Sequence, residues 1–455
     1  MTVTDRPRRP RVLYLSFYFP PSRASGVYRA RATANHLAGT GWDVTVFAAP
    51  LRFLYEAIGS VDEKLAGTVD PRIRVERPWQ SHFVWVSDIR QYSGFRKRFP
   101  LLAQALYQRA QKVFPEHYNS WGLASVARAV RMHRRKPFDV VVATGNPFAA
   151  FGAAWLINKL TGLPYVVDYR DAWTLNLFAD KPAFPDGHPA WGWERRVLDK
   201  ASAAVFVNEA LRHWHAERYP QDAGKMMIVP NGWDPDVLEH TPGGGLADHR
   251  STRPLRFSYV GTVTPVQPVR ELVEAFQIAR SHPTMAGAQL NLYGHLGFFK
   301  GSHHQLSELL EMDRDNRVGG RDTGMHYRGP VSKTQVAHAY AESDVLVFLA
   351  AGARYVTSGK IFEYMAQGRP IVSVHAPGIA AAEVLDGYPL WFNADSLEPD
   401  DIAQSMIAAA KAAEDLTPET RAAAIKHAEQ FTRRRVLEPF EARLREIARP
   451  ADRPA

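Results

Sequence analysis

Short runs of apolar, largely β-branched residues recur along the whole chain and alternate with stretches of helical pattern. Each run has the length of a buried strand. Parallel sheets covered by helices on both faces produce this alternation, so the pattern predicts an α/β protein with doubly wound parallel sheets. The strand-like runs occupy residues 11–19, 43–49, 139–145, 165–170, 203–208, 226–232, 255–262, 288–295, 325–331, 345–351 and 370–376.

One polar, glycine-rich stretch, HTPGGGLADHRSTRP at residues 240–254, interrupts the alternation. With 455 residues the chain is too long for one ordinary domain. We therefore expect two Rossmann-like domains, residues 1–240 and 241–430, facing across a cleft, because ligands of open α/β sheets gather beyond the carboxyl ends of the strands. Residues 431–455 are expected to form a C-terminal helix and a tail, with packing back on the first domain as one option.

The stretch VTSGKIFEYMAQGRPIVSV, residues 356–374, predicts a loop, a short helix and a buried strand. Thr357 or Ser358 can cap the helix, and a glycine and a proline follow its end. Lys360 and Glu363 are three residues apart and therefore share one helix face, while apolar neighbours turn towards a core. An ion pair on a solvated face is the plain interpretation of this pair. A polar ligand is the alternative.

Composition excludes several classes of protein. The chain has no cysteine, so it has neither a disulfide framework nor a thiolate metal site. Two D-x-D triplets, at residues 234–236 and 313–315, could suggest a site that binds a nucleotide through a metal ion. A turn with a helix cap explains the first better, and a charged helix end explains the second better, so we expect no metal. The polar start lacks the apolar core of a secretory signal, and no run approaches a membrane span. A cytoplasmic protein is expected.

Positive charge is concentrated in one segment. Residues 96–136 hold ten basic side chains and one acidic side chain, Glu116, a balance that equals the formal net charge of +9 of the whole chain. Within this segment LLAQALYQRAQKVF predicts a helix with an apolar stripe flanked by basic residues. Such a helix can rest on an anionic membrane surface, or it can pack on its own domain. No nucleic-acid-binding motif accompanies it, so nucleic acid is not expected as a partner.

Two loops that follow predicted strands carry candidate chemistry. Gly26 lies where a loop becomes a helix, and a residue without a Cβ allows backbone N–H groups to approach an anion, although the turn alone can also require it. VVDYRDAWTLN ends a strand with Asp168, Arg170, Asp171 and Trp173. Charges at the end of a buried strand need either mutual pairing or a polar ligand.

Several blocks, in their order along the chain, resemble the retaining GT-B glycosyltransferases of family 4. The blocks are FYFPP with SG and R after it, VVDYRDAW, WERRVLDKASAAVFVNE, MMIVPNGWD, YVGT and SGKIFEYMAQGRPIV, and the last is the most specific. They span residues 11–380. The resemblance implies two Rossmann-like domains and transfer of a sugar from a nucleotide diphosphate to an acceptor hydroxyl, with retention of the anomeric configuration.

The resemblance also implies roles for individual residues. In this family a lysine and an arginine contact the donor pyrophosphate, a glutamate holds the ribose, and a loop glycine meets the donor's phosphate and sugar. By position, Glu363 corresponds to the ribose glutamate and Gly26 to the loop glycine. Asn231 and Gly232 correspond to the turn near the hinge between the domains.

Several positions depart from the family pattern, and no histidine occupies the usual place near TGNP, residues 144–147. Tyr355 stands where the first glutamate of E-x7-E is expected, and Thr262 and Gln267 stand where an arginine and a lysine are usual. Lys360 would then supply positive charge together with an arginine, for which Arg170, Arg270 and Arg354 are the candidates. The expected donor-binding residues are Gly26, Gly261, Thr262, Arg270, Lys360, Ile361 and Glu363. The expected catalytic residues are Lys360, Arg170 and Asp171, and the expected acceptor-side residues are Asn146, Asp168 and Trp173.

The sequence thus predicts a metal-independent transferase that takes a sugar nucleotide of UDP or GDP type and needs no cofactor. Its acceptor would be a glycan, a lipid-linked or a small molecule, in polysaccharide, glycolipid or natural-product glycoside biosynthesis, with a peripheral place on the inner face of a membrane as one option. A sugar-nucleotide 2-epimerase of the same fold is one alternative. A sugar-nucleotide-binding protein without turnover is the other.

Overall fold

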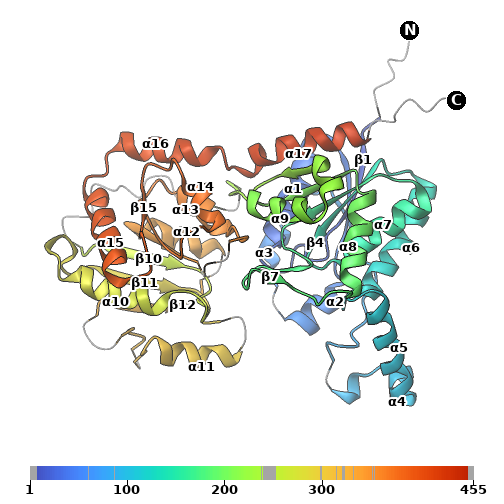
Figure 1. Ribbon diagram of the computed structural model, residues 1–455, viewed down its shortest axis with the longest axis horizontal. Coiled ribbons are helices and arrows are strands. Elements are labelled where there is room, and N and C mark those ends of the chain that lie inside the picture. The colour runs from blue at the N-terminus through green and yellow to red at the C-terminus, as the bar shows by residue number, and fades with distance from the viewer. Residues whose placement is uncertain are drawn as a thin grey trace, which may run out of the picture. The chain divides into compact units, whose positions relative to one another are not determined.

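A computed structural model describes residues 8–448 apart from 60, 87, 237, 239–252, 298–299, 314, 320–322, 332, 351 and 353. The chain divides into two compact units, Met1–Pro230 with Val436–Ala455 and Asn231–Arg435 (Figure 1). The stretch at 240–254, where the sequence predicts the boundary, lies mostly outside the described residues. The division itself falls earlier, after Pro230.

The first unit is built on a parallel sheet that has seven strands within the described residues, in the order β3-β2-β1-β4-β5-β8-β9. Its central strands are apolar runs and are buried along their whole length. A separate antiparallel pair consists of β6 (Leu175–Asn176) and β7 (Lys181–Pro182). The strands of the sheet are β1 (Arg11–Leu15), β2 (Asp43–Phe47), β3 (Arg74–Glu76), β4 (Val140–Gly145), β5 (Tyr165–Tyr169), β8 (Ala203–Phe206) and β9 (Met226–Ile228).

Helices connect the strands of the first unit and flank its sheet in Figure 1. They are α1 (Val27–Gly39), α2 (Leu51–Phe53), α3 (Glu63–Ala66), α4 (Gly94–Arg98), α5 (Pro100–Val113), α6 (Asn119–Arg135), α7 (Ala149–Thr161), α8 (Pro189–Lys200) and α9 (Glu209–Arg218). The last helix, α17 (Arg433–Ala448), belongs to this unit from Val436 onwards. The Trp42 indole N–H donates to the Glu441 carboxylate (2.9 Å), and the Arg445 guanidinium donates to the Thr40 carbonyl (2.6 Å).

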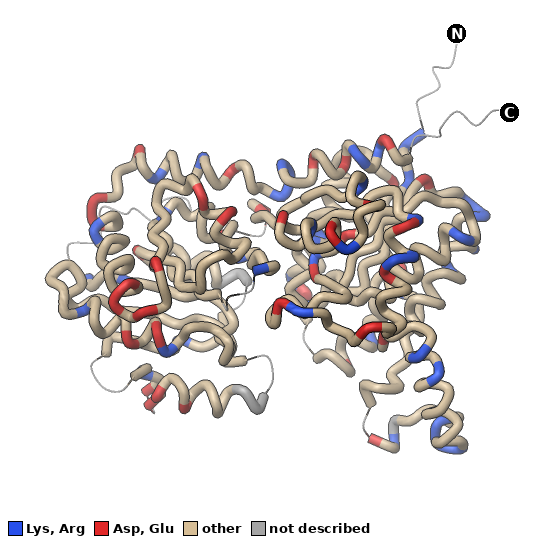
Figure 2. The backbone as a smooth tube through the Cα atoms, viewed as in Figure 1, with Lys and Arg blue, Asp and Glu red and all other residues tan. Residues whose placement is uncertain are grey.

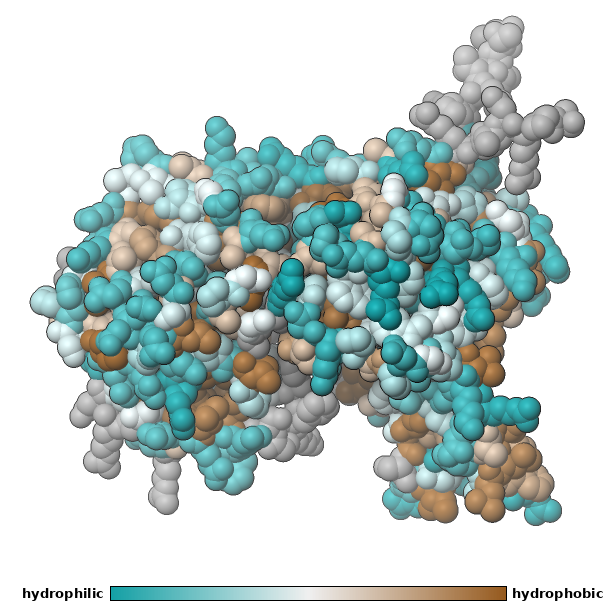
Figure 3. Space-filling model, viewed as in Figure 1, coloured by the Kyte–Doolittle hydropathy of each residue, from teal (hydrophilic) through white to brown (hydrophobic). Residues whose placement is uncertain are grey.

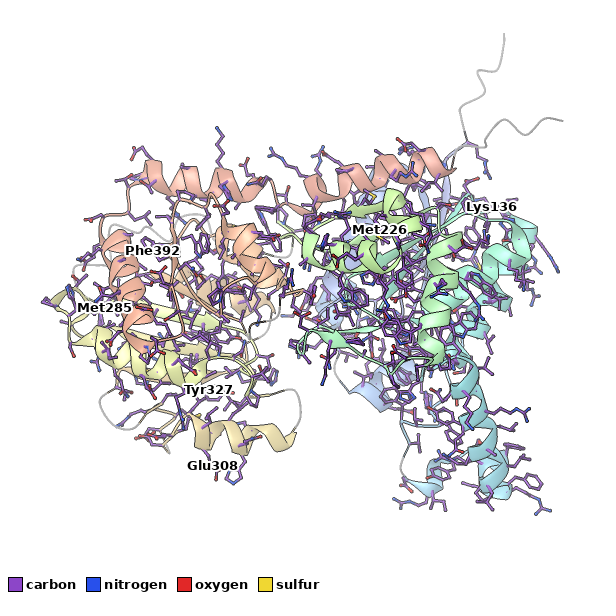
Figure 4. All side chains as sticks on the ribbon, in the orientation of Figure 1. Lys136, Met226, Met285, Glu308, Tyr327 and Phe392 are labelled. Atoms are coloured by element: carbon purple, nitrogen blue, oxygen red, sulfur yellow. The ribbon has the colours of Figure 1, made fainter. Side chains whose placement is uncertain are left out.

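The second unit holds a parallel sheet in the order β12-β11-β10-β13-β14-β15 among the described residues. Its core includes the fully buried Met285 (Figure 4). The strands are β10 (Arg256–Val260), β11 (Gln289–Tyr293), β12 (Met325–Gly329), β13 (Val345–Leu349), β14 (Ile371–Val374) and β15 (Trp391–Asn393). The helices are α10 (Val269–Arg280), α11 (Lys300–Leu309), α12 (Lys333–Ala341), α13 (Gly359–Met365), α14 (Ala380–Leu385), α15 (Pro399–Glu414) and α16 (Pro418–Glu429).

Each sheet reverses its strand order once, and the two reversals position the candidate sites. In the first unit β1 pairs with both β2 and β4, and in the second β10 pairs with both β11 and β13. In doubly wound sheets ligands bind beyond the carboxyl ends of the strands at this switch point. The loops after β1, β4 and β5, and those after β10 and β13, are therefore the places to look for chemistry.

The doubly wound α/β fold predicted from the sequence is thus confirmed in both units. No helix in the described ranges is long and apolar enough to cross a bilayer.

Candidate functional site

Helix α13 presents the lysine and the glutamate singled out in the sequence. Ser358 caps it, because its hydroxyl accepts from the Lys360 backbone N–H (3.4 Å). The buried face of the helix comprises Ile361, Phe362, Tyr364 and Met365, whereas Lys360 and Glu363 are half-buried. Ile361, expected among the donor-binding residues, is therefore a core side chain that fixes the helix.

The two charged side chains of α13 are not partners of each other. Among the described residues no ion pair joins Lys360 to Glu363; instead the Tyr340 hydroxyl donates to a Glu363 carboxylate oxygen (3.0 Å). The Lys360 ammonium lies 5.4 Å from the centre of the Tyr259 ring. The plain interpretation of a surface ion pair is therefore wrong.

Gly261, directly after β10, makes room for the lysine. A Cβ added to Gly261 would lie 1.8 Å from Lys360 Nζ, a distance that real Cβ atoms do not reach. The backbone there is also closely packed, since a Cβ on Gly294, whose φ is +139°, would lie 1.9 Å from the Gly261 carbonyl oxygen. The Tyr327 hydroxyl donates to the Gly294 carbonyl (2.8 Å; Tyr327 is labelled in Figure 4). The Lys360 side chain thus occupies the space that a side chain at residue 261 would need.

Gln267 supports the same loop instead of supplying charge. Its amide donates to the Tyr259 hydroxyl (3.1 Å) and to the Leu349 carbonyl at the end of β13 (3.2 Å), and its oxygen accepts from the Thr264 N–H (2.8 Å). The Tyr259 hydroxyl in turn donates to the carbonyl of the half-buried Thr262 (2.7 Å). A neutral hydrogen-bonded brace therefore occupies the position where the resemblance implies a lysine.

The other expected cations of the second unit lie in solvent. Arg270, on α10, and Arg354 are both exposed. Tyr355 is a buried ring, so an aromatic core residue stands where the family has a glutamate. Asn231 donates from its amide to the Thr357 carbonyl (3.2 Å), which ties the turn at the start of the unit to the loop before α13.

In the first unit Gly26 and Arg170 fit together as Gly261 and Lys360 do in the second. A Cβ on Gly26 would lie 2.0 Å from Arg170 Nη1 and 2.1 Å from Cζ. The Arg170 side chain is 12% exposed, donates to the Asn146 carbonyl (2.8 Å) and lies 3.6 Å from Asp171 Oδ2. The loops after β1, β4 and β5 therefore converge on one guanidinium, and this brings together four of the expected residues.

Asp168, expected on the acceptor side, is bound to a partner that the sequence did not reveal. Arg29 on α1 donates to both of its carboxylate oxygens (3.0 and 2.7 Å) and also to the Val229 carbonyl (2.9 Å). The side chains of this pair are 4% and 5% exposed. Trp173 is likewise buried, and its ring stacks on Phe148 with 5.2 Å between centroids. Both residues support the loops of the site from within the core.

A further acidic group near these loops was not predicted. Glu116 accepts the Phe148 backbone N–H (2.9 Å), just after β4, and burial raises the pKa of its carboxyl to about 7. Tyr18 follows β1, and its hydroxyl lies 2.9 Å from that of Tyr118. The only signal in the sequence was that Glu116 is the single acid in a basic segment.

No group of three or more His, Cys, Asp or Glu side chains among the described residues is placed to hold a metal ion. The D-x-D triplets lie in turns: the Asp236 N–H donates to Asp234 Oδ1 (3.1 Å), and the Asp315 N–H donates to Asp313 Oδ1 (2.8 Å).

Two protein-family domains match the chain. Residues 26–232 match the glycosyl transferase 4-like domain, and residues 254–412 match the glycosyl transferases group 1 domain. The chain belongs to the group 1 glycosyltransferases. The family inferred from sequence blocks is thereby confirmed. None of the curated protein sequences compared with this glycosyltransferase matches it.

Solved structures similar to this glycosyltransferase share its GT-B fold. A glycosyltransferase from Rickettsia africae ESF-5 is 12% identical, with a TM-score of 0.66, over 97% of this chain and 100% of that one. Alr3699/HepE from Anabaena, solved with UDP and glucose, is 14% identical, with a TM-score of 0.60, over 96% and 100% of the two chains. A putative UDP-N-acetylglucosamine 2-epimerase from Listeria monocytogenes is 12% identical, with a TM-score of 0.53, over 98% and 99%.

Proposed function

We propose that this glycosyltransferase moves a sugar from a UDP- or GDP-type donor to an acceptor hydroxyl with retention of anomeric configuration and without a metal ion. One observation carries the proposal. The Lys360 ammonium is held over Gly261 at the switch point of the second sheet, and it has no carboxylate partner in the described part of the chain. That the similar Anabaena structure holds UDP and glucose supports a nucleotide sugar as the donor.

Lys360 would act on the leaving group. As the bond between the sugar C1 and the diphosphate oxygen breaks, negative charge grows on the diphosphate, and a preorganised ammonium stabilises that charge. The acceptor oxygen then bonds to C1 from the face that the diphosphate leaves. Its proton passes to an oxygen of the departing diphosphate, so that the products are the glycoside and the nucleoside diphosphate.

Glu363 and the first unit would fix the two substrates. The Tyr340 hydroxyl orients the Glu363 carboxylate, whose lone pairs can accept the two ribose hydroxyls. Arg170, held by Asn146 and placed against Gly26, would contact the acceptor or the donor phosphate, with Asp171 beside it. The acceptor is a glycan, a lipid-linked or a small molecule.

Two variants of α13 test the donor site. Glu363→Ala should weaken binding of the free nucleoside diphosphate by about 1.5–3 kcal/mol in calorimetry, the range for a hydrogen bond to a charged group. Lys360→Ala should instead lower kcat by a factor of about 100, as loss of one preorganised donor does. Glu274→Ala and Lys411→Ala, on exposed positions of α10 and α15, are matched controls and should change neither quantity. Wild-type binding and turnover in both α13 variants would refute the assignment.

The donor incubated alone separates the transferase from its rivals. A 2-epimerase would convert the sugar nucleotide without an acceptor, and a binding protein would release no nucleoside diphosphate when acceptors are supplied. The proposal expects release only with an acceptor, and NMR of the product should show the donor's anomeric configuration. Turnover should persist in EDTA, because the proposal assigns neutralisation of the diphosphate to lysine and arginine. Complete loss of turnover that Mn²⁺ restores would overturn metal independence.

A further inference from the structure

Helices α4 and α5 form an unusual projection from the first unit, which we call the spur (residues 94–113). In Figure 1 the spur extends away from the sheet of that unit. Among the residues of α5 only Ala103 is buried, although a helix of 14 residues in a globular unit normally buries a whole stripe. The hydrophobic side chains that the sequence predicts along this helix therefore have little protein to cover them.

The exposed side chains of the spur are large and apolar. Six large apolar residues of the spur are each between 49% and 85% exposed, and Figure 3 shows hydrophobic residues gathered there. These side chains are Phe95, Phe99, Leu101, Leu102, Leu106 and Val113. Large apolar side chains concentrated in one exposed segment indicate an interaction site.

The same helices carry unpaired positive charge. Within the described residues Arg98, Arg109 and Lys112 have no carboxylate partner, and Figure 2 shows basic positions along α5. Arg96 differs, because its guanidinium lies 3.5 Å from the centre of the Tyr92 ring and donates to a loop carbonyl. Arg96 is therefore a structural residue and is a poor probe of surface charge.

Helix α6 repeats the combination at a second place. A groove of about 550 Å³ is lined by apolar side chains that include Leu123 and Leu160, and by Arg131, Arg134 and Arg135. These arginines too have no carboxylate partner among the described residues. Two basic residues of the segment are neutralised, since Arg128 pairs with Glu76 and Lys136 with Asp43 (2.9 Å each).

We propose that the spur docks this glycosyltransferase on an anionic lipid bilayer, with the apolar side chains among the acyl chains and the basic side chains at the headgroups. The basic side chains of the spur complement the negative charge of the lipid headgroups, and this favours a bilayer over other partners. A second copy would place like charges against each other, and nucleic acid would leave the exposed leucines without partners. The proposal goes beyond sugar transfer, and its test does not measure transfer.

The test uses the full chain and sucrose-loaded vesicles of phosphatidylglycerol mixed with phosphatidylcholine, with phosphatidylcholine alone as the neutral surface. Arg98→Gln, Arg109→Gln and Lys112→Gln together should weaken binding to anionic vesicles about 100-fold at low salt, since headgroup attraction adds roughly a factor of five for each basic residue. Leu101→Ser, Leu102→Ser and Leu106→Ser together should abolish tight binding. A control with the same loss of charge elsewhere, Lys64→Gln, Lys411→Gln and Lys426→Gln, should bind like the wild type.

Insertion of the spur into the bilayer can be measured directly. The chain has no cysteine, so one introduced cysteine gives a single site for a dye. Leu102→Cys labelled with a polarity-sensitive dye should show a blue shift on anionic vesicles, whereas Lys411→Cys with the same dye should not. Equal binding to neutral vesicles, or no shift at residue 102, would overturn the proposal. Dimerisation of the wild type without lipid would also overturn it, if the triple leucine variant no longer dimerised. So would RNA binding by the wild type that the triple leucine variant had lost.

Discussion

Gly26→Ala is the sharpest test of how the first unit holds Arg170. The added Cβ would lie 2.0 Å from Nη1 and 2.1 Å from Cζ of that arginine, so the guanidinium has to leave its place. It would lose the hydrogen bond to the Asn146 carbonyl (2.8 Å). The change should stay local to the loops after β1, β4 and β5, because the three atoms nearest to the added Cβ all belong to Arg170.

The magnitude follows from these contacts. A hydrogen bond from a charged donor contributes about 1.5–3 kcal/mol, and solvation of the displaced guanidinium recovers part of this. Alanine also caps a helix about 0.5–1 kcal/mol less well than glycine does. We therefore expect the free energy of unfolding to fall by about 1–3 kcal/mol, as measured by urea denaturation. If Arg170 contacts a substrate, kcat should fall by a factor of about 100.

Two controls make the reasoning refutable. Gly39→Ala, at the other end of α1, meets nothing within 4 Å and should leave stability and turnover unchanged or slightly raise stability. In a double-mutant cycle, Gly26→Ala should add little to the loss of turnover in Arg170→Ala, because both changes remove the same group. Fully additive losses of turnover would show that Gly26 acts by another route, and wild-type behaviour of Gly26→Ala would refute the steric argument.

Two further predictions concern buried charges of the first unit. Burial raises the pKa of Glu116 from 4.5 to about 7. The contribution of this carboxyl to the free energy of unfolding is therefore fully present below pH 4.5, and it is lost as the pH rises through 7. At most about 3 kcal/mol of unfolding free energy is involved, and Glu116→Gln should flatten this pH dependence in urea titrations. Asp168→Asn leaves Arg29 buried without its counter-charge and should cost about 3–5 kcal/mol, whereas Glu56→Gln, in an exposed pair, should cost under about 1 kcal/mol in the same assay. An Asp168→Asn protein as stable as the wild type would contradict the packing described here.

The central strands could be predicted from the sequence, because a strand that is buried on both faces appears as a continuous apolar run in the local sequence. The edge strands β3 and β15 were missed, since each has three residues that are half-buried or exposed. Helix α13 with Lys360 and Glu363 was predicted from local signals, namely a cap, an apolar face and a stop.

The contacts that shape the site could not be predicted in the same way. Arg29 and Asp168 are 139 residues apart, and Gln267 and the Leu349 carbonyl are 82 apart. Glu116 meets the Phe148 N–H across 32 residues. No local pattern marks such pairs, because the sheet topology alone brings them together. The same reason explains why Asp168 was expected at a ligand and lies in the core.

The division of the chain has a consequence for how the protein is made. The second unit is one continuous segment inserted into the first, and its two ends are bonded together: the Trp233 N–H donates to the Phe431 carbonyl (3.0 Å) and the Arg433 N–H to the Trp233 carbonyl (2.8 Å). On the ribosome the first unit cannot acquire the contacts of α17 until the whole inserted segment has been synthesised. A fragment ending at residue 230 would lack that helix. Residues 231–435 form one continuous compact unit and are therefore suited to separate expression.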